Sequence, residues 1–145
     1  MTPPRVCVTG STHGIGYAIA EAFARNGARL VINSNEPDTG AAKRLGQLTE
    51  CHFIQADLST SAGAQALIDG ANAIIGPLDT LVNNAGRFTD AAFGSLDEAM
   101  FDGAFDLNVK GYLFAAQAFA AQAELSQAQP GRNGTSIICI GSTNS

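Results

Sequence analysis

A glycine-containing segment near the N-terminus has residue types and a spacing that suit the binding of a diphosphate. It runs from Thr9 to Gly16 and joins an apolar run directly to a stretch of helical period. Its glycines follow the pattern Gly-x-x-x-Gly-x-Gly. We expect Gly10 to allow a sharp turn, Gly14 to let the backbone approach a ligand, and Gly16 to let the helix pack on a sheet. The first helical N–H groups would then face an anionic group.

Two other loop chemistries do not fit this segment. A phosphate loop that ends in Gly-Lys-Ser/Thr is excluded, because no lysine lies between Arg5 and Lys43. A nucleophilic serine at a strand-to-helix turn would need Ser where Thr12 stands, and the only later histidine, His52, completes no triad. Because the spacing differs from Gly-x-Gly-x-x-Gly, a glycine turn that serves only strand–helix packing stays open as the alternative.

Short apolar runs alternate along the chain with longer stretches of helical period, which is typical of βαβ units. The runs predict strands at residues 5–9, 30–32, 51–55, 80–82 and 135–140. The stretches predict helices at residues 14–26 and 38–48, from a Ser59 or Thr60 cap to about 75, and from a Ser95 capping box, with breaks at Gly103 and Gly111, to about 127. The predicted fold class is α/β, a Rossmann-type doubly wound parallel sheet with five strands.

Two further features of the strands and one of the connections follow from the residue pattern. The uninterrupted apolar run Ile137–Ile140 predicts burial on both faces of the fifth strand. Cys7, Cys51 and Cys139 lie far apart without metal-ligand spacing, so we expect reduced thiols buried in strands and no metal site. Residues 127–134 are expected to form a turn-rich connector.

Composition bounds the class of protein. With 145 residues, 46% of them hydrophobic and 14% charged, the chain is expected to form one packed globular domain. Its net charge of −5 and the lack of a basic run argue against nucleic-acid binding. The N-terminus lacks the plan of a signal peptide, and no apolar stretch approaches the roughly 18 residues of a membrane helix. We therefore expect a soluble, cytoplasmic protein.

A second motif, Leu81-Val-Asn-Asn-Ala-Gly86, follows the predicted fourth strand. Together with the glycine segment, it resembles the short-chain dehydrogenase/reductase family. Three other family markers occur in the same order, namely Asp57 after the third strand, Asn108 in Leu107-Asn-Val-Lys-Gly111, and Ser142 after the fifth strand. The resemblance covers nearly the whole chain. Its overall pattern is similar to 3-oxoacyl-carrier-protein reductases and to their sugar or polyol relatives.

The resemblance implies a nicotinamide dinucleotide held at the ends of the strands. Asp57 would accept from the adenine amino group beside Leu58, and Asn83 would tie the fourth strand into the sheet. A helix-cap role for Asp57 and a simple turn at residues 83–86 stay open as alternatives. The implied cofactor-binding residues are Gly10, Ser11, Thr12, His13, Gly14, Ile15, Gly16, Ser34, Asn35, Asp57, Leu58, Asn84, Ala85 and Gly86.

The end of the second strand predicts NADP, with NAD as the alternative. An NAD enzyme places an acid there to accept from the ribose 2′-OH, and this chain has Ser34 instead. Asn35 can donate to a phosphate, and His13 occupies a loop position that is often basic in NADP-preferring family members. His13 is a weaker partner for a phosphate than Arg or Lys, and neither of those residues confirms the preference here. Glu36 argues for NAD.

The resemblance also implies two catalytic residues. Ser142 would hydrogen-bond the substrate carbonyl, and Asn108 would interrupt its helix and hold a water of the proton relay. Each has a plainer alternative, since serine is common in turns and an asparagine in a helix is often merely exposed. The substrate implied is a small-molecule carbonyl or alcohol.

The family's Tyr-x-x-x-Lys pair is missing from the sequence. Tyr17 and Tyr112 are followed four positions later by Glu21 and Ala116, and three residues follow Ser142. We therefore expect residues 1–145 to be the N-terminal dinucleotide-binding domain of a longer NADP(H)-dependent oxidoreductase, incomplete after the fifth strand and inactive alone. The helix at residues 112–125 resembles one that pairs across a family dimer, so the intact protein is expected to be a homo-oligomer. A non-catalytic nucleotide-binding or scaffolding protein is the alternative.

Overall fold

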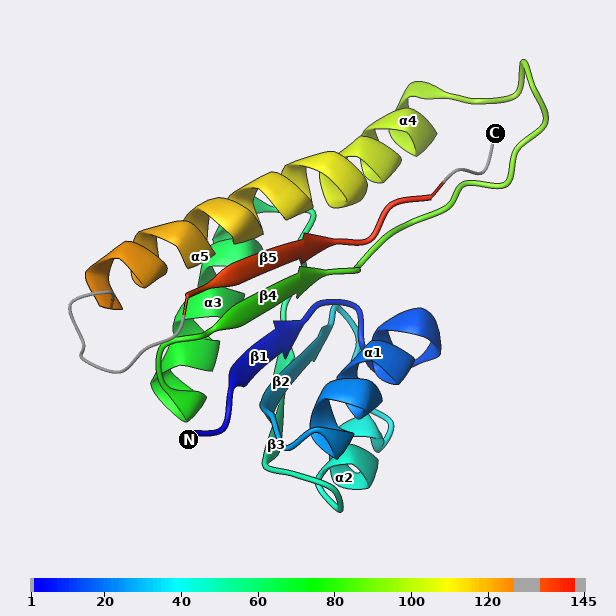
Figure 1. Cartoon of the computed structure of the whole chain (residues 1–145). Helices are drawn as coiled ribbons and strands as arrows, with labels where there is room; N and C mark the ends of the chain where they lie inside the picture. The colour runs from blue at the N-terminus through cyan, green and yellow to red at the C-terminus, as the bar shows by residue number, and fades with distance from the viewer. Residues whose placement is uncertain (1, 127–133, 143–145) are drawn as a thin grey trace.

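The computed structural model describes residues 2–126 and 134–142, and a five-stranded parallel sheet forms its centre (Figure 1). The strand order is β3-β2-β1-β4-β5, and each neighbouring pair is parallel. The chain therefore winds outward in both directions from β1, which confirms the predicted doubly wound fold. The strands are β1 (Arg5–Val8), β2 (Arg29–Ser34), β3 (Cys51–Gln55), β4 (Thr80–Asn83) and β5 (Ser136–Cys139).

Helices cover both faces of the sheet. On one face lie α1 (Gly14–Arg25) and α2 (Ala41–Leu45), and on the other lie α3 (Ser61–Ile75) and α5 (Tyr112–Ser126). α5 continues a rod that starts with α4 (Glu98–Phe105) and a π-helical turn, η1 (Asp106–Gly111).

The core has two layers because successive strand side chains point to opposite faces. Cys7 and Val31 pack with α3 and α5, whereas Val6 and Leu30 pack with α1 and α2. All four side chains are fully buried. The continuous apolar runs of β1 and β2 thus reflect a sheet that is covered on both sides.

Helix starts agree with the sequence at α3 but not at α4. Thr60 caps α3, since its Oγ1 accepts from the Gly63 N–H at 3.0 Å. The predicted capping box at Ser95 is wrong, because Asp97 caps α4 by accepting from the Met100 N–H at 2.8 Å. Ser95 instead donates its hydroxyl to the Ala92 carbonyl at 2.7 Å.

The predicted helix breaks at Gly103 and Gly111 are also wrong. Gly103 lies inside α4, and Gly111 lies at the end of η1, where the helical rod continues into α5. A Cβ atom added at Gly111 would lie 2.6 Å from the Leu58 carbonyl oxygen. This glycine therefore allows a close approach between the rod and the segment after β3, and does not end a helix.

The predicted burial of the fifth strand is wrong for the described chain. Among the residues that the structure describes, β5 pairs only with β4, and Ile137 and Ile138 are 42% and 41% exposed. A run of apolar residues indicates that a strand prefers to be buried, but it does not supply the element that buries it. No described element covers the outer side of β5. The cysteine prediction fails in part, because only Cys7 is buried. Cys51, in the edge strand β3, is half-buried and Cys139, in the edge strand β5, is exposed, and none of the three forms a disulfide. Most of the predicted connector, residues 127–133, lies outside the described residues.

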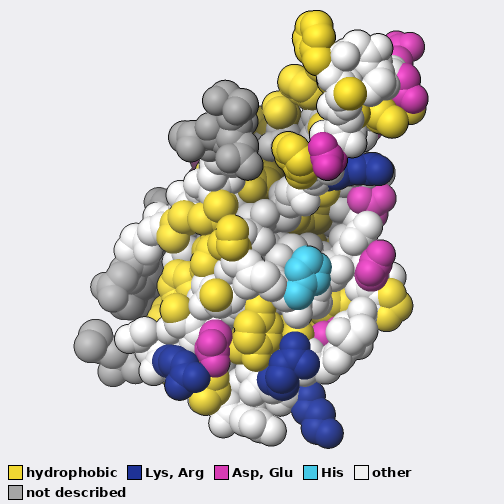
Figure 2. Space-filling view, turned by 90° about the vertical axis from the view of Figure 1, so that its right-hand side faces the viewer, with side chains coloured by type: hydrophobic (Ala, Val, Ile, Leu, Met, Phe, Trp, Pro, Cys, Tyr) yellow, Lys and Arg dark blue, Asp and Glu magenta, His cyan; other side chains and the backbone are white. Residues whose placement is uncertain are grey.

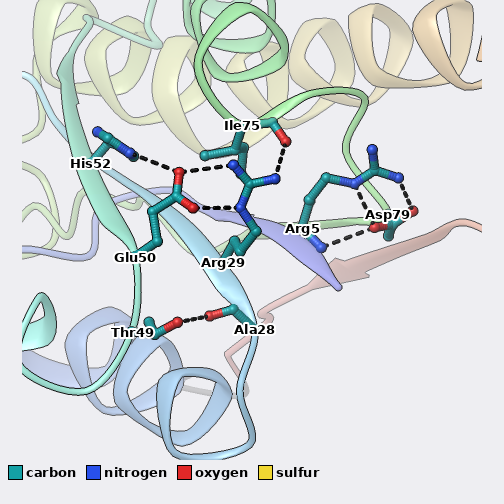
Figure 3. A network of polar contacts seen from close by, with 8 residues as sticks. All are labelled: Arg5, Ala28, Arg29, Thr49, Glu50, His52, Ile75 and Asp79. Carbon is teal, nitrogen blue, oxygen red and sulfur yellow. Dashed lines mark hydrogen bonds and ion pairs between the residues drawn. The ribbon is translucent and has the colours of Figure 1, made fainter. Parts of the chain in front are cut away.

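The amino ends of the strands are joined by ion pairs (Figure 3). The Arg5 guanidinium forms two hydrogen bonds to the Asp79 carboxylate, at 3.0 and 3.1 Å. Arg29 does the same with Glu50, at 2.6 and 2.8 Å, and His52 Nε2 lies 3.1 Å from Glu50 Oε1. Together, these pairs connect the starts of β1 to β4 and of β2 to β3. In the described part of the chain, no helix is long and apolar enough to cross a membrane.

Candidate functional site

A cleft of about 260 Å³ opens at the carboxyl ends of β1, β2 and β4. The chain leaves β1 toward β2 on one side, and β4 lies on the other, so the cleft sits at the switch point of the sheet, where ligands bind in such folds. The lining includes every predicted cofactor residue except Ser11. It consists of Gly10, Thr12, His13, Gly14, Ile15, Gly16, Asn33, Ser34, Asn35, Ala56, Asp57, Leu58, Asn84, Ala85, Gly86 and Leu107.

Two glycines allow α1 and its loop to approach the end of β4. Gly10 has φ +58°, and a Cβ atom there would lie 2.7 Å from the Ala85 Cα. A Cβ atom at Gly16 would overlap the Gly10 carbonyl oxygen and the Asn84 side-chain nitrogen. A larger residue at either position would push the glycine segment away from residues 84–85.

The N-terminus of α1 faces the cleft with its polar groups uncommitted. His13 precedes the helix in an extended conformation, and its side chain makes no capping hydrogen bond. The N–H groups of Gly14, Ile15 and Gly16 have no acceptor among the described residues. These donors and the positive end of the helix dipole form a site that an anionic group would satisfy.

Thr9 locks the glycine segment to the chain after β4. Its buried Oγ1 accepts from the N–H groups of Asn84 and Ala85, both at 2.9 Å. The Asn84 side-chain NH₂ donates to the carbonyls of Thr9 and Gly10, at 3.0 and 2.9 Å. The sequence analysis missed Thr9 as a positioning residue, because its partners lie 75 and 76 residues away.

Asn33 joins the ends of β2 and β3 to the glycine segment, and the sequence analysis also missed it. Its side-chain NH₂ donates to the carbonyls of Ile54 and Ala56 at 3.1 and 3.2 Å, and its Oδ1 accepts from the Gly10 N–H at 3.4 Å. Only 1% of this residue is exposed. An amide within the apolar run of β2 was the available signal, because a buried polar side chain needs partners.

Ser11 does not line the cleft, and its side chain instead points into the protein, toward the ends of β1 and β2. It is fully buried, its Oγ donates to the Val8 carbonyl, and the same Oγ accepts from the Asn33 N–H at 3.1 Å. Its own N–H donates to the Asn33 carbonyl at 2.9 Å. The structure therefore places Ser11 between β1 and β2, where it holds the loop in position.

Asp57 lines the cleft and also makes a local turn. Its Oδ1 accepts from the Ser59 N–H at 2.9 Å, which is the alternative role that the sequence left open. No group among the described residues donates a hydrogen bond to its Oδ2, so one carboxylate oxygen is available to a ligand. Leu58 beside it is buried and offers an apolar wall.

The end of β2 presents no acidic side chain to the cleft. Ser34 and Asn35 line it, and the Ser34 Oγ accepts from the Glu36 N–H at 3.1 Å. Asp38, the next acid, accepts from the N–H groups of Gly40, Ala41 and Ala42 at 3.1, 2.8 and 3.0 Å. Its carboxylate is thereby committed to the start of α2.

The two predicted catalytic residues lie outside the cleft lining, on the same edge of the sheet. Asn108 lies in η1, where its Oδ1 accepts from the Arg87 N–H at 2.7 Å and its Nδ2 donates to the Arg87 carbonyl at 2.8 Å. Its side chain is thus committed to the segment after β4. Ser142 is exposed and follows β5 by three residues.

Tyr112 joins α5 to the end of β4 and to the segment between β5 and Ser142. Its hydroxyl donates to the Ile140 carbonyl at 3.1 Å, and its own carbonyl accepts from the Asn83 side chain at 3.2 Å. The Asn83 side chain also contacts Cys139 Sγ at 3.9 Å, so it joins β4 to α5 and to the neighbouring strand β5. Burial raises the pKa of Tyr112 above its ordinary value.

Comparisons with known proteins agree with this site. Residues 4–145 match the family model described as short chain dehydrogenase. The chain is similar to an uncharacterized oxidoreductase of Methylorubrum extorquens, with 39% identity over 115 residues that cover 77% of this chain and 46% of that protein.

Two solved structures show the same architecture. One is the NADH-dependent reductase A1-R′ complexed with NAD, at 28% identity and a TM-score of 0.87, covering 98% of this chain and 61% of that one. The other is a Pseudomonas aeruginosa RhlG/NADP active-site complex, at 31% identity and a TM-score of 0.86, covering 98% and 58%. The chain thus spans less than two thirds of the length of each of these three relatives. With its sheet order, its cleft and these matches, the chain belongs to the short-chain dehydrogenase family.

Proposed function

We propose that the cleft binds a nicotinamide dinucleotide, and that the chain is the dinucleotide-binding part of an oxidoreductase acting on a carbonyl or alcohol substrate. The observation that carries this proposal is the uncapped N-terminus of α1, with three free N–H groups in the cleft beside Ala85 and Gly86. Two of the similar structures are complexes with NAD and with NADP, which supports it.

The described residues fit such a cofactor. The free N–H groups of residues 14–16 would hold the diphosphate. Asp57 Oδ2 would accept from the adenine amino group over the Leu58 side chain, and Ala85 with Gly86 would border the ribose. Thr9 and Ser11, which do not line the cleft, would hold these segments in place, and Asn33 would do so from the lining itself. The bound nicotinamide would supply the site that gives or takes the hydride.

The proposal extends to Ser142 and Asn108 as residues of the reaction centre. Ser142 follows a parallel strand at its carboxyl end, where its hydroxyl can donate to a substrate carbonyl oxygen. Both polar atoms of the Asn108 side chain bond to Arg87. The water of the relay would therefore be held by the main chain of the π-helical turn, which the side chain keeps in place against the segment after β4.

We infer a preference for NADP over NAD. An acid that would repel a 2′-phosphate is missing from the cleft at Ser34, and the Asp38 carboxylate is already bonded to three backbone N–H groups. Glu36 is exposed and does not line the cleft. The Ser34 hydroxyl and the Asn35 amide are neutral donors that tolerate either cofactor, so the preference is expected to be moderate.

We further propose that the 145-residue chain does not transfer hydride by itself. It contains no Tyr-x-x-x-Lys pair. Tyr112 cannot replace the tyrosine, because its hydroxyl is bonded to the Ile140 carbonyl and burial raises its pKa, which opposes ionisation. The same observation favours a second candidate function, a nucleotide-binding protein without turnover.

Exposed apolar side chains support a proposal that the intact protein is a homo-oligomer. Figure 2 shows hydrophobic side chains gathered at the upper end of one face, over α4 and the segment before it. Phe88 is 79% exposed, and Phe101 and Phe105 stack with their ring centroids 4.3 Å apart while each stays about half exposed. A patch of this kind is typical of protein contacts.

Titration with NADPH and NADH, followed by nicotinamide fluorescence, tests the cofactor proposal. We expect saturable binding of both, tighter for NADPH, and no turnover of carbonyl substrates. No fluorescence change with either cofactor, from protein shown to be folded by circular dichroism, would overturn it. To separate enzyme from binding protein, the coding sequence downstream of Ser145 should be read and expressed: a Tyr-x-x-x-Lys pair with NADPH oxidation supports the enzyme, and a stop codon at this position supports the binding protein.

A further inference from the structure

Resting on the proposed function, we infer that the substrate carries a carboxylate besides its carbonyl group, and that the Arg87 guanidinium binds this carboxylate. The substrate class is then a small oxo acid or the matching hydroxy acid. Arg87 directly follows Gly86, which lines the cleft. Because Arg87 lies just beyond the lining, its position suits a group that contacts the substrate and not the dinucleotide.

The main chain of Arg87 is held at both of its polar groups. Its N–H donates to Asn108 Oδ1 at 2.7 Å, and its carbonyl accepts from Asn108 Nδ2 at 2.8 Å. The residue is therefore fixed to the π-helical turn, although it is exposed to solvent. A fixed main chain lowers the entropy cost of binding a ligand with this side chain.

Gly103 leaves room for the guanidinium against α4. A Cβ atom added at Gly103 would lie 3.0 Å from Arg87 Nη1 and 3.7 Å from its Cζ, so the guanidinium lies against the main chain of this helix. Glycine in the interior of a helix is destabilising relative to alanine. The contact with Arg87 accounts for a glycine that lies inside α4 and does not end it.

The charge of Arg87 has no anionic partner among the described residues. Arg5 and Arg29 pair with carboxylates at the amino ends of the strands, and Lys110, on the same helical rod, pairs with Asp106 at 2.6 Å. Arg87 makes no such pair in the described part of the chain. Its planar guanidinium can therefore take both oxygens of a ligand carboxylate with two parallel N–H groups.

Two acids near Arg87 favour a carboxylate over a phosphate as its ligand. Asp90 follows Arg87 by three residues, and Asp102 is the neighbour of Gly103 in α4. Neither forms an ion pair with Arg87 in the part of the chain that the structure describes. Because like charges repel, these carboxylates oppose a doubly charged phosphate more strongly than a singly charged carboxylate.

The segments that carry Arg87 and Ser142 leave the sheet together. The Ile140 N–H donates to the Asn83 carbonyl at 2.9 Å, so the two segments are still paired at this point. Ser142 follows two residues later on one segment, and Arg87 four residues later on the other. Figure 1 shows both segments running on in the same direction, toward the end of the rod that carries α4. A substrate with its carbonyl at Ser142 can therefore place a carboxylate at Arg87.

Binding of a charged and a neutral ketone to the full chain loaded with NADP⁺ tests the inference without turnover. NADP⁺ has no hydride to give, so a ketone can bind but cannot react. The probes are levulinate and its uncharged methyl ester, and NMR of the arginine Nε–Hε groups reports the contact. We expect levulinate to shift the Arg87 signal with a Kd of about 1 to 20 mM, and methyl levulinate to bind at least about fivefold more weakly.

Three variants separate a specific contact from general charge. Arg87→Gln should weaken levulinate about tenfold and change NADPH affinity less than about twofold. Arg87→Lys keeps the charge without the planar fork, and should weaken levulinate only about threefold. Lys43→Gln removes the same charge from α2, and should change levulinate affinity less than about twofold.

Gly103→Ala distinguishes ligand binding from a structural role of the arginine. Alanine favours the helix, so the urea midpoint should not fall. The new Cβ would lie 3.0 Å from Arg87 Nη1 and should displace the guanidinium. We therefore expect levulinate to bind about threefold more weakly in a protein that is at least as stable.

The outcomes that would overturn the inference differ from those that test the cofactor. Equal losses of levulinate affinity from Arg87→Gln and Lys43→Gln would show a net-charge effect. If NADPH bound but levulinate left the Arg87 signal unchanged up to about 50 mM, or bound no better than its ester, Arg87 would not be a carboxylate site and the cofactor proposal would stand. If folded wild type bound no NADPH, the proposed function would fail together with this inference.

Discussion

The two ends of the sheet use different chemistry. At the amino ends of the strands, Arg5 and Arg29 are paired with Asp79 and Glu50 through short, two-point contacts (Figure 3). At the carboxyl ends, hydroxyls, amides and backbone groups make the hydrogen bonds between segments, and the Asp57 carboxylate accepts only from the nearby Ser59 N–H among the described residues. The N–H groups that open α1 are left free. The charged side chains at the amino ends are thus paired with one another, whereas the carboxyl ends keep N–H donors available for a ligand.

This difference separates stability from binding in space. The strands have four to six residues, so the two ends lie about 13 to 20 Å apart. Effects of mutations at that distance usually add. Changes at the amino end should therefore alter unfolding alone, whereas changes at the carboxyl end should alter ligand binding as well.

The largest effect is expected from Gly16→Ala at the carboxyl end. The new Cβ would overlap the Gly10 carbonyl and the Asn84 side chain, so the glycine segment must move away from β4. We expect NADPH affinity to fall more than about tenfold and the free energy of unfolding to fall by about 2 kcal/mol. Fluorescence titration and urea denaturation measure the two quantities.

Gly27→Ala is the matched control at the other end of α1. Gly27 has φ +80° and nothing within 4 Å of an added Cβ, so this change introduces backbone strain without a clash. It should cost about 1 kcal/mol of stability and leave NADPH affinity unchanged. Unchanged NADPH affinity in Gly16→Ala would contradict the role of this close approach.

Thr9→Val should have the next largest effect. It keeps the shape of the side chain but removes the acceptor of two N–H groups, those of Asn84 and Ala85. We expect the free energy of unfolding to fall by about 2 kcal/mol, with weaker NADPH binding, because buried donors are left unsatisfied. Thr9→Ser keeps the hydroxyl and should restore most of the binding; if Ser and Val behaved alike, the hydroxyl would not be what positions residues 84–85.

How far the sequence predicts this molecule depends on the range of the interactions. The periods of two and 3.6 residues are local, so strand β3 and the start of α3 were predicted at the residues where the structure has them. The start of α4 was missed, because Ser95 and Asp97 both fit a capping pattern and only the backbone distinguishes them. The exposure of β5 was missed, because a sequence pattern does not say which element covers a strand.

The candidate site shows the same limit. The glycine segment and the Asn84–Gly86 motif are local, and the structure brings their residues to one cleft. Thr9 and Asn33 act across 75 and 23 residues, so no local pattern shows what they bond to. Ser11 lies inside the loop motif, but its side chain turns toward Val8 and away from the cleft, which depends on the conformation of the turn.

A smaller effect is expected from Asp79→Asn at the amino end. The Arg5–Asp79 pair is partly buried and two-pronged, and its loss should lower the free energy of unfolding by about 1 kcal/mol. NADPH affinity should not change. The double variant with Thr9→Val should equal the sum of the single variants within about 0.5 kcal/mol, and a larger coupling would contradict the separation of the two ends.

The smallest effect is expected from titration of Glu50. Its hydrogen bonds to Arg29 and His52 lower the pKa of Glu50 to about 2, from an ordinary value of 4.5. A carboxylate whose pKa falls on folding stabilises the native state above its unfolded pKa, and this contribution disappears as the pH falls toward the folded pKa. The stability difference between wild type and Glu50→Gln should therefore be constant above pH 5 and shrink between pH 4.5 and 2. Urea midpoints measured across this range at low and at 1 M salt provide the check, since salt should reduce a difference that arises at an exposed pair. If this difference did not vary with pH, the charge of Glu50 would contribute nothing to the free energy of unfolding. The electrostatic stabilisation at the amino ends of the strands would then come from the Arg5–Asp79 pair alone.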